Sequence, residues 1–172
     1  MPTVRLVALL AYSVAVVALV IPDRDVFRLP VTESSLADPP LRLRLAAEVL
    51  RTAERLQAAQ VGYAGMTPVE VLAWRVVLQS EQADSLFRDL LRSGTRPGQL
   101  YALAGLRFLV DIHRSDVGAY RSASQRLAQS RERVPTTIGC ILSAAPLGSL
   151  VHEIDAGAWT DEFLAGRLLG KH

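Results

Sequence analysis

Cys140 is the only cysteine of the chain and the residue best suited to nucleophilic chemistry, because a thiolate attacks readily once its pKa is lowered. Lowering that pKa needs a basic neighbour, whereas Cys140 lies in an apolar stretch, residues 134–142, that contains no Lys, Arg or His. We therefore expect a free thiol that is buried and unreactive. The alternative is a reactive or partner-linked thiol, with His113 or His152 brought to it by the fold.

The histidines do not have the spacing of a metal site. His152 and Glu153 match the start of a zinc-protease helix, in which a second histidine follows the first by four residues. That position is Ala156, and His172 is the terminal residue. With three histidines and one cysteine, the chain also lacks the ligands of a multi-cysteine zinc or iron–sulfur site. We expect no metal and no cofactor.

Other catalytic motifs are missing from the sequence. Residues 94–98 contain two glycines but no Lys-Ser or Lys-Thr pair, so they do not match a phosphate-binding loop. Ser143 and Ser149 lack the flanking glycines of a nucleophile elbow. A net charge of +2 is too small to attract nucleic acid strongly. We predict a protein that is not an enzyme, has no small-molecule substrate and binds no nucleic acid.

Trp159 is the residue best suited to contact a partner protein. It follows Gly157 and Ala158 late in the chain, and tryptophan is enriched at the centres of interfaces. The structural alternative is a tryptophan that closes the core between the last two helices.

The N-terminal residues predict a membrane segment. After Arg5, an apolar run extends from Leu6 to Ile21 and ends before Pro22. Counted from Pro2 to Ile21, the segment just reaches the length of a bilayer-spanning helix, whose lower limit is roughly 17 residues. We expect residues 4–21 to anchor the chain in a membrane, with the C-terminal body exported to the periplasm because Arg5 precedes the run. The alternatives are a cleaved secretory signal and a buried helix of a soluble domain.

Residues 22–40 read as an extended linker, because they contain four prolines together with serines and aspartates. From Leu41 onward the apolar residues recur at helical spacing. We predict a mainly α-helical domain over residues 41–172. Its expected helices cover residues 41–56, 67–78, 83–91, 97–112, 116–128, 146–157 and 160–169.

Two features refine this prediction of the domain. The helix of residues 67–78 is apolar nearly all round, so we expect it to be the central one. Residues 134–142 contain β-branched residues with Pro and Gly, and we expect an extended segment packed on the helices. The short turns between successive helices are similar to HEAT-type helical hairpins in architecture.

The stretch Gln99–Leu106 (QLYALAGL), followed by Gly139-Cys140-Ile141, resembles a loose group of uncharacterised exported bacterial helical proteins. The resemblance covers about half of the chain and implies a helical fold and export. It also implies a disulfide between the Gly-Cys cysteine and a second cysteine, at the position that Ala104 occupies here. Because that partner is missing, the resemblance leaves Cys140 free.

We therefore expect a non-catalytic, membrane-anchored helical protein that binds a protein partner, such as an accessory subunit of a photosynthetic or respiratory membrane complex. A second hypothesis is a secreted or periplasmic soluble helical binding domain whose N-terminus is removed. A third is an enzyme that uses Cys140.

Overall fold

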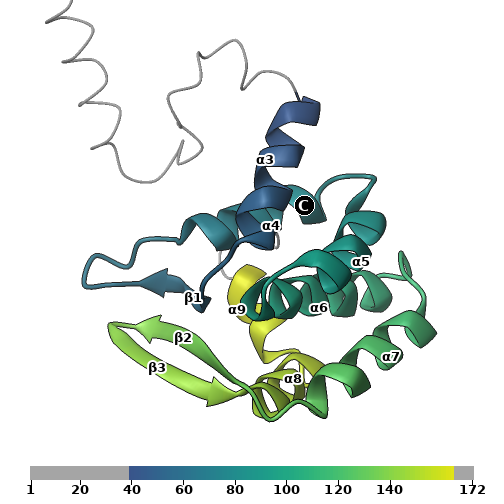
Figure 1. Cartoon of the computed structure of the whole chain (residues 1–172). Helices are drawn as coiled ribbons and strands as arrows, with labels where there is room; N and C mark the ends of the chain where they lie inside the picture. The colour runs from purple at the N-terminus through teal and green to yellow at the C-terminus, as the bar shows by residue number, and fades with distance from the viewer. Residues whose placement is uncertain (1–38, 165–172) are drawn as a thin grey trace, which may run out of the picture.

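The computed structural model of the chain describes residues 39–164, which form seven helices and three strands (Figure 1). In chain order these are α3 (Pro39–Arg51), β1 (Leu56–Val61), α4 (Val69–Leu78), α5 (Ala83–Ser93), α6 (Arg96–Asp111), α7 (Val117–Ala128), β2 (Arg133–Gly139), β3 (Ile141–Pro146), α8 (Leu147–Asp155) and α9 (Ala158–Leu164). The prediction of a mainly helical fold with an extended segment near 134–142 is confirmed.

The prediction of a membrane-anchored protein with an exported body has to be corrected. Among residues 39–164, no helix is long and apolar enough to cross a bilayer. The segment expected to do so, residues 4–21, lies outside the described residues, as does the linker before Pro39.

The helices surround α6, which is the true centre of the fold. Almost every residue of α6 from Pro97 to Leu106 is buried, and the helix contacts all the other helices of the described range. The sequence pattern predicted α4 in this role; α4 is also largely buried but lies beside α6. In a helical solenoid each repeat contacts only its neighbours. The helices here pack around one central member instead of stacking pair upon pair.

Helix α6 begins as its sequence predicts. Thr95 accepts a hydrogen bond from the Gly98 N–H, and Pro97 lies in the first turn, where its missing N–H costs nothing. Its small residues allow α5 to come close, because the ring of Phe87 packs directly on Gly105. Phe87 of α5 also belongs to a buried aromatic cluster. The centroid of its ring lies 6.4 Å from that of Trp74 in α4.

Strand β1 is a part of the fold that the sequence does not predict. We expected one helix over residues 41–56, but α3 ends at Arg51 and the chain enters a strand at Leu56. The segment Leu56–Val61 has the sequence LQAAQV, whose alanines and glutamines favour helix over strand. Parallel pairing with β2 and burial of Leu56, Ala58 and Ala59 outweigh that local preference.

The three strands form one sheet in the order β1-β2-β3. Strand β1 pairs with β2 in parallel, and β2 pairs with β3 in a tight antiparallel hairpin. In Figure 1 the strands gather on one side of the molecule, and most of the helices lie on the other. The sheet therefore projects from the helical body with one end left uncovered.

Replacing Gly105 with alanine tests the close packing of α5 on α6. A Cβ at this position would lie 2.3 Å from the Phe87 ring, whose side chain is fully buried and cannot move aside. We expect Gly105→Ala to lower the free energy of unfolding by about 1–3 kcal/mol, as overpacked cores do. Urea denaturation followed by circular dichroism measures the change.

The matched control is Gly118→Ala in α7. Gly118 is exposed, and an added Cβ there would meet only the carboxylate of Asp116, the far end of a short side chain. Alanine is the better helix former, so this variant should be as stable as the parent or more stable. Equal stability of the Gly105→Ala variant and the parent would contradict the close packing.

Candidate functional site

The position of the sheet is set by two side chains that bind the outer edge of β1. The buried hydroxyl of Tyr101 in α6 accepts a hydrogen bond of 2.9 Å from the Gln57 N–H. The carboxylate of Glu162 in α9 accepts one of 3.0 Å from the Ala59 N–H. Burial raises the pKa of Tyr101, which keeps the hydroxyl protonated. The backbone N–H groups of Gln57 and Ala59 therefore both have hydrogen-bond partners from the helical body.

The far end of the sheet is a two-residue turn between β2 and β3. Gly139 has a φ of +57° and occupies the first turn position, where a type II′ turn needs the left-handed backbone that glycine adopts without strain. Cys140 occupies the second position. Its thiol is free and exposed, so the prediction of a buried thiol is wrong. The reason is that apolar residues flank this cysteine in a turn, beyond the reach of the core.

A cluster of exposed apolar side chains surrounds this turn. The described residues expose eight large hydrophobic side chains, and only Ile112 and Val117 lie elsewhere. The other six are Tyr63, Met66, Val69, Ile138, Ile141 and Leu142. We call these six residues, together with Cys140, the sheet tip. Exposed apolar side chains gathered at one end of a fold are typical of binding sites.

Backbone contacts hold the two halves of the sheet tip together. The N–H of Gly62, at the end of β1, donates to the carbonyl of Gly139 over 3.0 Å. Val61 pairs with Met66 across the loop that carries Tyr63, which is fully exposed. Ile138 pairs directly with Ile141 across the hairpin. Residues far apart in the sequence thus meet at one end of the sheet.

This surface contains no charge, although 21% of the chain is charged. Residues 56–69 and 134–146, which supply the sheet except for Arg133 at the start of β2 and also the loop after β1, include no Asp, Glu, Lys or Arg. Charged residues resume on either side, at Arg55, Glu70 and Arg133. Exposed sheets usually carry charged side chains that discourage association, so their absence here favours a surface that binds another protein.

A shallow pocket of about 540 Å³ lies beside the sheet tip, and Val69 and Leu142 belong to both. Its remaining walls come from Val49 in α3, from the segment Thr52–Arg55 that follows α3 and includes the charged Glu54 and Arg55, and from Thr137. Gln57 and Glu70 complete the lining and are joined by a side-chain hydrogen bond of 2.8 Å. Thr137 is 7% exposed, and its hydroxyl has no hydrogen-bond partner among the described residues. The pocket adds a small polar recess to a mostly apolar surface.

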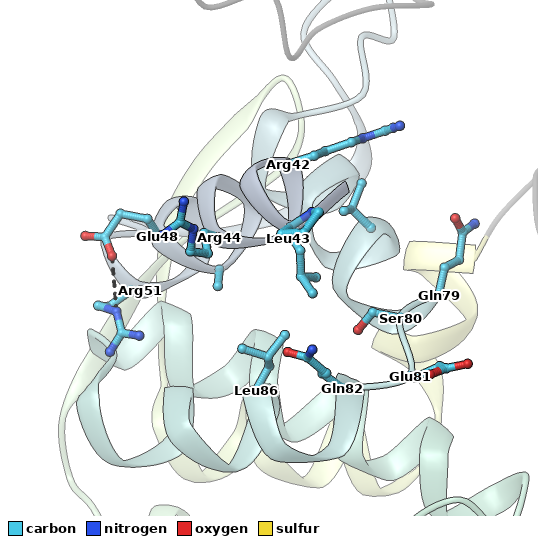
Figure 2. Close-up of a pocket in the computed structure, with 13 residues that line it drawn as sticks. Arg42, Leu43, Arg44, Glu48, Arg51, Gln79, Ser80, Glu81, Gln82 and Leu86 are labelled. Atoms are coloured by element: carbon cyan, nitrogen blue, oxygen red, sulfur yellow. Dashed lines mark hydrogen bonds and ion pairs between the residues drawn. The ribbon is translucent and has the colours of Figure 1, made fainter. Parts of the chain in front are cut away.

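A larger groove of about 980 Å³ lies between α3 and the turn that joins α4 to α5 (Figure 2). Leu43 and Leu86 form part of its apolar lining. Glu48 and Arg51 form an ion pair of 3.2 Å at one end, and Gln79 and Glu81 lie toward the other. The lining therefore mixes apolar side chains with charges of both signs and directs no set of groups at a ligand.

Trp159 lies in the core. Its side chain is 5% exposed, packs against Phe163 and donates a hydrogen bond of 2.7 Å from the indole nitrogen to Glu153. It joins α9 to α8, which is the arrangement of the structural alternative. An anchor for a partner needs an accessible indole, so we do not include Trp159 in the binding surface.

The residues considered for chemistry are not brought together. Within residues 39–164, no hydrogen bond or ion pair joins Cys140 to His113, which follows α6, or to His152, which is exposed on α8. The same range contains no cluster of His, Cys, Asp and Glu side chains that could hold a metal ion. His172 lies outside the described residues.

Comparison of the chain with models of known protein families, with characterised proteins and with solved structures finds no match. The resemblance to exported bacterial helical proteins therefore stays a prediction. The sheet tip is therefore the feature of the described residues that points to a function.

The unpartnered hydroxyl of Thr137 predicts a stabilising substitution. A buried hydroxyl without a partner costs free energy, so Thr137→Val should raise the free energy of unfolding by about 1 kcal/mol. The control is Thr136→Val on the neighbouring position, where the hydroxyl bonds Ser143 over 2.7 Å and its loss should be destabilising. Chemical denaturation of both variants checks the prediction, and destabilisation by Thr137→Val would refute it.

Proposed function

We propose that this chain is a non-catalytic helical protein that acts by binding another protein through the sheet tip, as a subunit or adaptor of a larger assembly. One observation supports the proposal above the others: six of the eight large exposed apolar side chains of the described range gather at this one place. Burying such a surface against a partner releases ordered water and is favourable in proportion to the apolar area.

The lack of charge limits what the partner can be. A charged group pressed against the sheet tip would lose its hydration and gain no opposite charge in return. The matching surface should therefore be apolar or neutral.

The third hypothesis, a cysteine-dependent enzyme, receives less support from the geometry. A nucleophilic cysteine works with a base within hydrogen-bond reach. Cys140 lies at the apex of a turn on an apolar surface, without a hydrogen bond to any side chain of the described residues. Its position suits a contact residue better than a nucleophile.

The single exposed thiol allows a direct test. A maleimide photocrosslinker attached to native Cys140 in the full chain is illuminated in an extract of the cells that produce the protein, and adducts are identified by mass spectrometry. We expect a defined protein adduct. The double variant Tyr63→Ser/Met66→Ser should lose it, because the variant removes apolar contact area without touching the core or the label.

The matched control carries the same label on α7, in the variant Cys140→Ser/Val117→Cys. Val117 is an exposed apolar residue but lies away from the sheet. Identical adducts from both positions, or an adduct between Cys140 and a different protein that survives the Tyr63/Met66 double variant, would refute the proposal.

A further inference from the structure

Strand β3 has one edge that faces away from the sheet. Within residues 39–164 it pairs only with β2, and the pair that flanks the two-residue turn is Ile138 with Ile141. In such a hairpin the flanking pair is hydrogen-bonded, and bonded and non-bonded pairs alternate from there. The backbone N–H and C=O groups of Leu142 and Ala144 therefore point outward, away from β2.

The two edges of the sheet are treated differently. The amides on the outer edge of β1 are bound by Tyr101 and Glu162, as described above. On the outer edge of β3, the contact within the described range is one from Arg133, whose guanidinium donates to the carbonyl of Ala144. Strand β3 has no charged side chain and no proline before its last residue, so it lacks the usual barriers to strand addition.

The order of side chains in β3 matches its own reverse. Residues 141–145 read Ile-Leu-Ser-Ala-Ala, with large side chains before Ser143 and small ones after it. When two copies pair antiparallel about Ser143, Leu142 faces Ala144 of the other copy, and Ile141 faces Ala145. Each large side chain meets a small one on the same face, while the outward groups of Leu142 and Ala144 bond each other.

The absence of charged side chains from β3 also favours a second copy. A segment carrying charge would bury it against the uncharged strand, whereas a second β3 brings an equally uncharged surface. The geometry points to a two-fold homodimer in which β3 pairs with β3 of a second copy, centred on Ser143, to give one continuous six-stranded sheet. This inference rests on the proposed function, because it names one partner of the same uncharged surface.

Two consequences follow from the pairing. The guanidinium of Arg133 has to leave the Ala144 carbonyl, which its exposed position permits. Cys140 lies three residues from the centre on each chain, so the native thiols are about 20 Å apart at the usual rise along a strand. The dimer is therefore non-covalent, and Cys140 stays available for labelling.

Disulfide trapping tests the pairing and its register. In the full chain with Cys140→Ser, the added variant Ser143→Cys places two thiols opposite each other at a non-hydrogen-bonded pair, where Cα atoms lie about 4.5 Å apart, within disulfide range. We expect rapid formation of a covalent dimer on mild oxidation. The control Cys140→Ser/Ala144→Cys places its Cα atoms about 8 Å apart, too far for a disulfide, and should stay largely monomeric.

A second measurement covers the case in which Ser143→Cys disturbs the hairpin. Light scattering of the parent chain over a range of concentrations should show a dimer, and Ala144→Pro should shift it at least tenfold toward monomer, because proline removes an outward N–H that the hairpin does not use. A parent chain that is monomeric throughout, or equal trapping through positions 143 and 144, would overturn the inference. Since neither readout involves Tyr63 or Met66, this failure would leave the heterologous crosslink of the proposed function intact.

Discussion

The structure depends on how the first strand is attached to the helical body. Tyr101 and Glu162, from two different helices, accept hydrogen bonds from successive outward amides of β1. Because a sheet propagates from strand to strand, fixing β1 also fixes β2 and β3. Without those two acceptors, the amides of Gln57 and Ala59 would be left without partners next to the core, a costly arrangement. The attachment allows a small sheet to project from the helices as a rigid element.

Charge is divided between the two parts of the molecule. The helices carry the ion pairs, such as Arg51 with Asp89 between α3 and α5, and Arg96 with Glu132 beyond α7. The sheet and its loop carry one charged side chain, Arg133 at the start of β2, and none near the sheet tip. The charged helices resist association, while the neutral sheet tip does not. This division is the physical basis for assigning the binding surface to the sheet and not to a helical face.

The sequence predicted the helices better than the sheet. Thr95 with Pro97 marks the start of α6, and Asp116 caps α7 through the Ala119 N–H, because these signals act within one turn of the chain. Strand β1 could not be predicted from LQAAQV, since only its pairing with a segment about 80 residues away makes it a strand. Cys140 was misplaced for a related reason: an apolar neighbourhood in sequence is not a buried one when it spans a turn. The missed signal was the absence of charge in residues 56–69 and 134–146.

In this structure the helical body binds the outward N–H groups of β1 and leaves the outward N–H groups of β3 without a partner among the described residues. Amide hydrogen exchange by nuclear magnetic resonance, in protein dilute enough to be monomeric, tests it residue by residue. We expect slow exchange at Gln57, which donates to Tyr101, and at Ala59, which donates to Glu162. We expect fast exchange at Leu142 and Ala144. Slow exchange at Leu142 and Ala144, or fast exchange at Gln57 and Ala59, would contradict it.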